Sequence, residues 1–110
     1  SVNNLDEILA VPGVDGIICG LNDLSASINK FGQVWDPEMI DLMNQIMDKC
    51  KKAGKPFGAS LGMNYEMAKY WIDRGASFIS IGFPQDYYMM VGREVIGNIR
   101  KIESERPDTK

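Results

Sequence analysis

The sequence contains no histidine, and this absence removes a large group of catalytic mechanisms. Its 110 residues include no His at all. A Ser-His-Asp triad within this chain is therefore excluded. Any catalysis must use carboxylates, Lys, Tyr, a metal ion or backbone donors.

Cysteine is scarce, with only two in the chain. Two are too few for the disulfide framework of a small secreted domain. Cys19 falls inside a strand-like run, and Cys50 falls on the apolar face of a predicted helix. Both are interpreted as small buried hydrophobic residues. We therefore expect a reducing environment and a cytoplasmic protein.

Basic clusters and long apolar runs are also missing. The net charge is -3, and no block of Lys and Arg is present to bind phosphates, so we expect no nucleic-acid partner. The apolar runs are far too short to cross a bilayer, and no signal peptide is visible, so we expect no membrane partner. The chain begins at Ser1 without an initiator methionine, as a piece of a larger protein would.

Helical and strand-like segments alternate along the chain. Continuous apolar runs predict strands at 16–20, 56–60 and 77–82. Apolar residues at helical spacing predict helices at 3–11, 37–52, 62–75 and 84–105. Alternation with short connections predicts a parallel sheet with right-handed crossovers. The expected fold is a single α/β domain over residues 1–110.

Several residues are typical of helix boundaries. Asn3 is expected to cap the first helix, with Asp6 completing a capping box. Asp36 followed by Pro37 predicts the start of the second long helix. Asn64 is expected to cap the third, and Gly75 to end it.

Three of the predicted helices carry an apolar stripe that is expected to face inward. The expected inward-facing residues are Met39, Ile40, Met43, Ile46, Met47 and Cys50 on the second helix, Met67, Ala68, Trp71 and Ile72 on the third, and Tyr88, Val91, Val95, Ile99 and Ile102 on the last. The strand at 16–20 is expected to be covered on both faces.

Each predicted strand ends at Gly or Ser, which leaves the backbone at the carboxyl ends of the strands unobstructed. In α/β folds, ligands bind at that edge. Three strands do not close a barrel, which usually needs about 250 residues, and they leave two open edges. We expect either a small open sheet or a barrel completed by other residues or subunits. The open edges and Met-rich faces favour a homo-oligomer.

The stretch GIICGLNDLSAS, residues 16–27, places a carboxylate directly after a strand. Spacing alone favours Asp23 as a residue of a helical first turn, and Asn22 as a turn residue. Ser25 and Ser27 are interpreted as surface or capping hydroxyls. The alternative is a binding site, because hard cations prefer oxygen ligands and free amides at a helix start, next to Gly20, can bind an anion.

Longer stretches of the chain resemble a known family. NLDEILAVPGVDGIICGLNDLSASI, then FGQVWDP, AGKPFG and RGASFISIG, are similar to the divalent-metal-dependent (class II) pyruvate aldolases. That family includes 4-hydroxy-2-oxoheptanedioate aldolase and is related to the citrate lyase beta chain. The resemblance implies a (β/α)8 TIM barrel, of which this chain would form the last three strand–helix units, incomplete on its own.

The resemblance also implies a chemistry. Members cleave 4-hydroxy-2-oxo acids to pyruvate and an aldehyde, and a bound Mg²⁺, Mn²⁺ or Co²⁺ chelates the 2-oxo acid. Asp23 matches the aspartate that ligates the metal. The amides of Asn22 and Asp23, beside Gly20, match those that receive the pyruvate carboxylate. Leu61 matches an apolar contact for the aldehyde part.

The chain departs from the family pattern in two respects. Leu21 stands where many relatives have proline. The second metal ligand, a glutamate, and an arginine that polarises the keto group would lie upstream of Ser1. The isolated chain is therefore expected to be an inefficient enzyme. The alternative is a non-catalytic α/β domain with a weak metal or anion site; a flavodoxin-like nucleotide module is disfavoured because a Gly-rich phosphate loop is missing.

Overall fold

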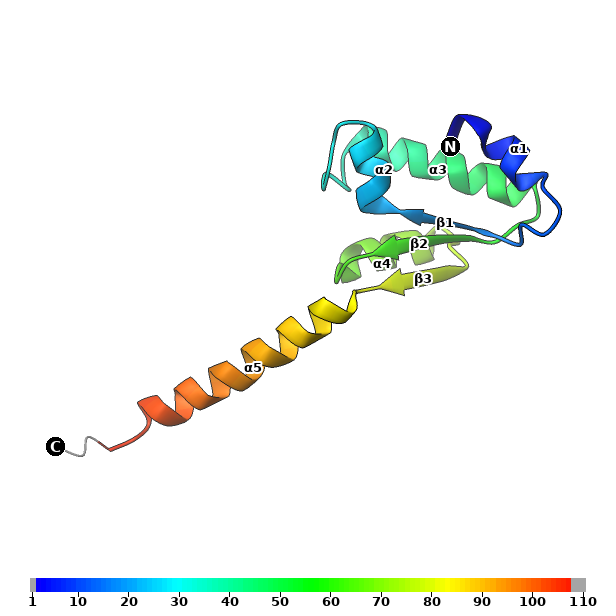
Figure 1. Cartoon of the computed structure of the whole chain (residues 1–110). Coiled ribbons are helices and arrows are strands. Elements are labelled where there is room, and N and C mark those ends of the chain that lie inside the picture. Colours follow the sequence, from blue (N-terminus) through cyan, green and yellow to red (C-terminus); the bar gives the residue numbers. More distant parts are fainter. Residues whose placement is uncertain (1, 108–110) are drawn as a thin grey trace.

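Three parallel strands form the sheet at the centre of the fold. A computed structural model describes residues 2–107 and contains β1 (Ile17–Gly20), β2 (Phe57–Leu61) and β3 (Phe78–Ile81), in the spatial order β1-β2-β3. Gly20 pairs with Ser60, and Ser60 with Ser80. All three strands therefore end at one edge of the sheet (Figure 1). The predicted parallel α/β fold is confirmed.

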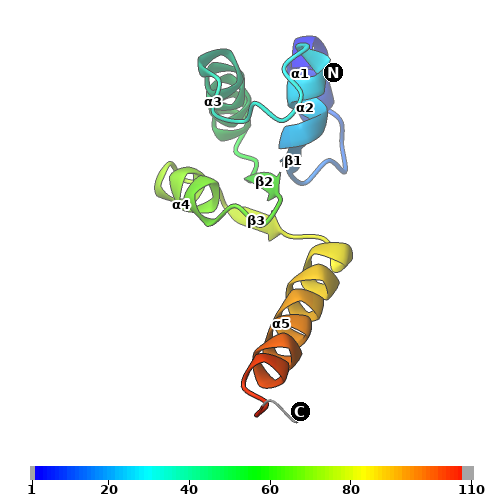
Figure 2. The same ribbon diagram turned by 90° about the vertical axis from the view of Figure 1, so that its left-hand side faces the viewer.

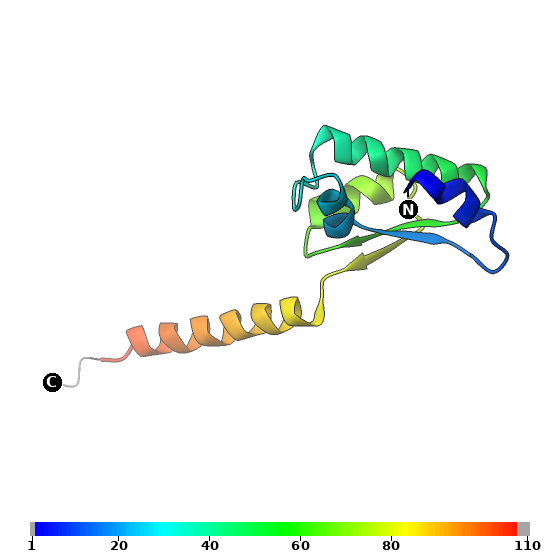
Figure 3. The ribbon, with the colours of Figure 1, turned by 45° about the horizontal axis from the view of Figure 1, so that its top comes forward.

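Helices cover one face of this sheet. The helical elements of the described chain are η1 (a 3₁₀ turn, Val2–Asn4), α1 (Leu5–Leu9), α2 (Leu21–Ser27), α3 (Pro37–Lys52), α4 (Tyr65–Asp73) and α5 (Pro84–Ser104). Figures 2 and 3 show α1, α3 and α4 on the same side of the strands. The core lies between them, and its largest fully buried apolar side chains are Met39, Met43, Cys50, Met67 and Trp71. Ile72, predicted to face inward, is instead exposed.

Two of the predicted helix caps are confirmed. The Asp36 Oδ1 accepts a hydrogen bond from the Glu38 N–H at 2.9 Å, with Pro37 in the first helical position. The Asn64 Oδ1 accepts one from the Met67 N–H at 3.0 Å. These bonds satisfy amides that have no partner within the helix.

The predicted cap of the first helix is wrong. Asn3 lies within η1, and α1 begins only at Leu5. Asn4 therefore occupies the N-cap position, and within the part of the chain that the structure describes its side chain makes no capping hydrogen bond. An Asn before an apolar stripe thus indicates a helix start here, but not which residue begins it.

The second face of the sheet is open. Side chains alternate between faces along a strand, so Ile18 and Phe78 point away from the helices, and they remain 51% and 41% exposed. The prediction that β1 is covered on both faces is therefore wrong. The Phe78 ring lies across Gly58, where an added Cβ would come within 2.2 Å of it. Nearer the carboxyl edge this open face carries only small residues, Gly20, Ser60 and Ser80.

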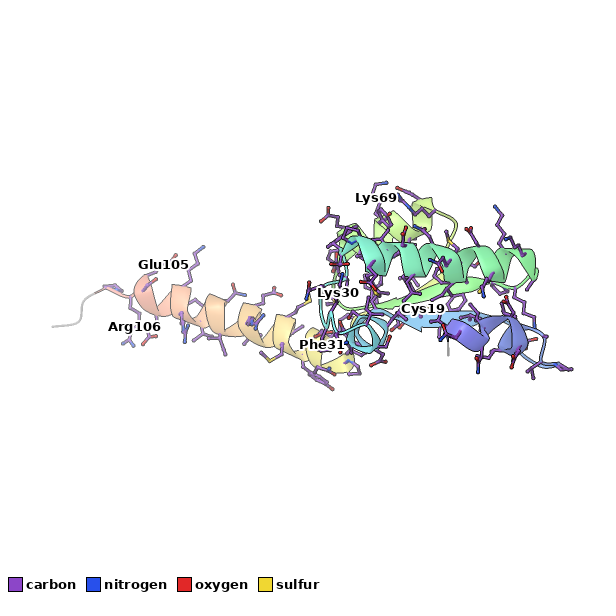
Figure 4. The ribbon with its side chains drawn as sticks, turned by 90° about the horizontal axis from the view of Figure 1, so that it is seen from above. Cys19, Lys30, Phe31, Lys69, Glu105 and Arg106 are labelled. Carbon is purple, nitrogen blue, oxygen red and sulfur yellow. The ribbon has the colours of Figure 1, made fainter. Side chains whose placement is uncertain are left out.

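Helix α5 projects away from the rest of the molecule. None of its residues is buried, and its predicted stripe is 54% to 80% exposed. The molecule extends over 74 Å and has a radius of gyration of 20.1 Å, against about 13 Å for a compact domain of this length. Figure 4 shows side chains around α5 with no neighbouring helix beside them. The helix is confirmed, but its stripe is not covered by the described chain.

The strands do not close a barrel within residues 2–107. β1 and β3 each pair only with β2, so the sheet has two open edges there. Among the same residues, no helix combines the length and the hydropathy that a membrane span requires.

Replacing Asn64 by Ala is expected to lower the free energy of unfolding by about 1 kcal/mol, because the Met67 amide loses its cap. Chemical denaturation measures the change. Asn4→Ala is the matched control, since Asn4 is also an N-cap residue but makes no cap bond among the described residues. Equal losses for the two variants would contradict the assigned caps.

Candidate functional site

A cavity of about 370 Å³ lies at the carboxyl edge of the sheet. Its walls include all four residues that the sequence predicted for the site, Gly20, Asn22, Asp23 and Leu61. They come from two strand ends that are about forty residues apart in the chain. Parallel pairing of β1 with β2 brings them together. This edge is where α/β folds bind ligands.

Asp23 presents a free carboxylate at this cavity. It lies in the first turn of α2 and is exposed. Among residues 2–107, no hydrogen bond or ion pair engages this carboxylate. The Asp23 side chain therefore does not act as a helix cap in this structure.

Gly20 leaves space for that carboxylate. A Cβ added at Gly20 would lie 3.2 Å from the Asp23 Oδ2, which is tighter than ordinary van der Waals contact. A larger residue would therefore push the carboxylate away. Leu21, which directly follows Gly20, is 4% exposed and packs in the core. Leucine at this position thus anchors the start of α2.

Leu61 and Asn22 border the cavity in different ways. Asn22 is exposed at the start of α2, and its amide is one of the first amides of a helix, which have no acceptor within the helix. Leu61 is 3% exposed and pairs with Ile81 at the end of β2. It supplies a small apolar patch of the cavity wall.

Sequence reasoning did not assign the other residues of the wall, among them Val34, Asn64 and Phe83. Val34 comes from the loop between α2 and α3, Asn64 from the start of α4 and Phe83 from the turn after β3. Asn64 and Phe83 lie in the short turns that follow β2 and β3, a position that indicates the carboxyl edge. Val34 carries no such signal, because a loop residue enters the wall only through the folding of its loop.

A second cavity, of about 330 Å³, adjoins the first along the open edge of β1. Gly20 and Asp23 line both cavities. Apolar residues of η1, α1 and β1 form much of its wall, among them Leu5 and Ile18. The Asp23 carboxylate therefore lies where the carboxyl edge meets an unpaired strand edge.

The donor set fits a hard divalent cation only in part. Asp23 supplies carboxylate oxygens, the ligand type that Mg²⁺ and Mn²⁺ prefer. The described residues contain no group of three or more His, Cys, Asp or Glu side chains close enough to hold a metal ion. Mg²⁺ is commonly bound through one or two carboxylates together with water and substrate oxygens. One carboxylate of such a site is present here.

Comparison with known proteins agrees with this architecture. Residues 1–89 match the family model of HpcH/HpaI aldolase/citrate lyase. The chain is 37% identical over 82 residues to hydroxypyruvate/pyruvate aldolase of Agrobacterium fabrum and 29% identical over 100 residues to 5-keto-4-deoxy-D-glucarate aldolase of an Enterobacter species. These matches cover 74% and 91% of this chain but 30% and 39% of the relatives. The chain thus spans about a third of the length of these relatives.

A solved structure shows the same fold. The HpcH/HpaI aldolase of Desulfitobacterium hafniense superposes with a TM-score of 0.81 and 23% identity, over 99% of this chain and 40% of that one. This likeness supports the predicted fold class, part of a (β/α)8 barrel. The match of the family model over most of the chain carries the assignment: the chain belongs to the HpcH/HpaI aldolase/citrate lyase family.

Proposed function

We propose that this chain contributes to a metal-dependent carbon–carbon lyase that acts on 4-hydroxy-2-oxo acids. The observation that carries the proposal is the free Asp23 carboxylate facing the cavity at the carboxyl edge, beside Asn22 and Leu61. Membership in an aldolase family and the keto-acid names of the relatives support it. In the reaction, the C3–C4 bond breaks, the 4-hydroxyl loses its proton to give an aldehyde, and C3 gains a proton to give pyruvate.

The residues of the cavity have distinct proposed roles. Asp23 donates a carboxylate oxygen to Mg²⁺, Mn²⁺ or Co²⁺, and the cation would supply Lewis-acid polarisation of the 2-oxo group. The amides of Asn22 and Asp23 bind the substrate carboxylate, because the first turn of α2 has free N–H groups. Gly20 keeps this turn accessible, and Leu61 contacts the aldehyde part.

The rest of the ligand set is proposed to come from outside the described residues. The open edge of β1 and the adjoining cavity provide a route by which another carboxylate and a cationic group can reach Asp23. They could belong to an upstream strand of the same polypeptide or to another chain. The alternative, a non-catalytic α/β domain, predicts that no such groups meet there and that metal binding stays weak.

Free thiols fit a reducing compartment, so a cytoplasmic location stays part of the proposal. Cys19 and Cys50 are buried free cysteines. Burial, with the nearby Cys50, raises the pKa of the Cys19 thiol to about 12. A protonated, buried thiol is unreactive and behaves as a small apolar group.

A homo-oligomer is also proposed, with α5 as its contact. The turn into α5 is fixed: the Asp86 Oδ2 accepts a hydrogen bond from the Phe83 N–H at 2.8 Å, and the Tyr87 hydroxyl donates to the Ile81 carbonyl oxygen at 2.8 Å. Gly82 has a φ of 71°, and a Cβ added there would lie 2.9 Å from the Tyr87 hydroxyl oxygen. These contacts hold α5 away from its own sheet. A second copy is then the partner proposed to cover the stripe, in line with the open strand edges.

Asp23→Asn is expected to reduce aldol cleavage of a 4-hydroxy-2-oxo acid with Mn²⁺ by roughly 100-fold or more, because even outer partners of metal ligands cost about 10- to 100-fold when removed. The assay uses protein expressed from its complete reading frame. Asp15→Asn is the control, since Asp15 is also an exposed aspartate but precedes β1, at the opposite end of that strand. Retained turnover in Asp23→Asn would exclude the proposed ligand.

The 110 residues alone are expected to bind Mn²⁺ weakly and to turn over little substrate, because Asp23 is the one carboxylate among the described residues that lines the cavity. Titration calorimetry with Mn²⁺ followed by pyruvate compares them with the protein from the complete reading frame. Robust turnover by the 110 residues alone, abolished by Asp23→Ala, would refute the proposal that other groups complete the site. Failure of both proteins to bind would favour the non-catalytic alternative.

Replacing Val95 and Ile99 together by Asp is expected to lower the molecular mass in solution, because it places charges on the exposed stripe of α5. Light scattering coupled to size-exclusion chromatography measures the mass. Arg93 and Arg100, both replaced by Asp, are the control on the opposite side of the same helix. A wild-type monomer, or equal masses for all three proteins, would contradict the proposed contact.

A further inference from the structure

Ser25 is the one buried polar side chain among the residues that the structure describes, with 0% of its surface exposed. Its hydroxyl donates a hydrogen bond to the Asn22 carbonyl oxygen at 2.9 Å and accepts one from the Gly32 N–H at 3.2 Å. The interpretation of this serine as a surface or capping hydroxyl is therefore wrong. It joins α2 to the following loop, residues 28–36.

Further contacts fix the same loop at both ends. The Ser25 carbonyl oxygen accepts a hydrogen bond from the Lys30 N–H at 2.8 Å. The Lys30 Nζ binds the Asp36 Oδ1 at 2.7 Å, and Asp36 caps α3. Between these ends, the Gly32 backbone has a φ of 76°, a conformation that suits glycine. The loop is thus held to α2 through the amide of Gly32.

The two parts that Ser25 joins face each other across the candidate site. Asn22 and Asp23 line the cavity from the start of α2, and Val34 lines it from the loop. Gly32 is exposed, so without the Ser25 hydroxyl its amide would bond water instead, and the loop that carries Val34 would lose this hydrogen bond to α2. The Asn22 peptide would lose a restraint at the same time. The Asp23 carboxylate makes no hydrogen bond with Ser25 among the described residues, so its position is expected to change less.

We propose that Ser25 is a positioning residue: its buried hydroxyl holds the Asn22 peptide and the loop at 28–36 in the arrangement that fits a bound 2-oxo acid. This inference rests on the proposed function and deepens it. It separates two parts of the site. The Asp23 carboxylate serves the cation, whereas Ser25 acts on the organic acid through the Asn22–Asp23 peptide and the loop.

Ser25→Ala is the test, with Ser27→Ala as the matched control. The Ser27 hydroxyl makes the same kind of bond, to the Leu24 carbonyl oxygen at 2.6 Å, but it is exposed and, among the described residues, makes no hydrogen bond to the loop. Protein from the complete reading frame is titrated with Mn²⁺ and then, once loaded, with oxalate as a stable dicarboxylate probe. In Ser25→Ala we expect oxalate to bind about ten-fold more weakly, with Mn²⁺ affinity changed by less than about three-fold. Ser27→Ala is expected to bind both as the wild type does.

Hydrogen exchange of the Gly32 amide provides a readout independent of the metal. Exchange is expected to quicken in Ser25→Ala and to stay slow in Ser27→Ala. If Ser25→Ala does not fold, Ser25→Cys, which keeps a small side chain with a weak S–H donor, is expected to fold and to weaken oxalate binding by a smaller factor.

The outcomes separate the two proposals. Wild-type protein that binds neither Mn²⁺ nor oxalate would contradict the proposed function, and the inference with it. Wild-type protein that binds both, together with a Ser25→Ala variant that binds oxalate equally well despite faster Gly32 exchange, would overturn only the role of Ser25. A parallel loss of Mn²⁺ and oxalate binding would also overturn it, because the effect would then be general unfolding of the site.

Discussion

The parallel register between β1 and β2 is the constraint on which the candidate site depends. Pairing of Gly20 with Ser60 places the turn after β1 and the turn after β2 at one edge of the sheet. Asn22, Asp23 and Leu61 therefore border a single cavity although about forty residues separate them in the chain. The core between the sheet and the helices α3 and α4 supports this register through fully buried methionines and Trp71. Removal of this packing would separate the two walls of the site.

The same architecture leaves apolar surface without cover. The face of the sheet that carries Ile18 and Phe78 is open, both outer strand edges within residues 2–107 are unpaired, and α5 projects from the carboxyl edge (Figure 1). The open edge of β1 adjoins the candidate site, since Asp23 also borders the cavity along β1. We therefore regard completion of the site and burial of these surfaces as one problem, solved by further strands, by a second copy or by both.

Local signals in the sequence predicted much of this structure, and tertiary packing decided the rest. Asp36–Pro37 and Asn64 mark helix starts because their side chains bond amides within three residues. Asn3 failed as a cap because a 3₁₀ turn moved the helix start. The apolar residues of α5 do lie on one side of the helix, but their spacing in the sequence does not predict which part of the protein packs against them. Ser25 resembles Ser27 in sequence, and only the fold of the loop at 28–36 buries one and exposes the other.

The Asp23 carboxylate is the centre of this account, and a crystal structure of the protein from its complete reading frame, soaked with Mn²⁺ and oxalate, tests it most directly. The account predicts an anomalous manganese peak within coordination distance of an Asp23 oxygen, with an oxalate carboxylate at the amides of Asn22 and Asp23. A manganese peak elsewhere, with Asp23 turned to the amides of its own helix, would contradict it.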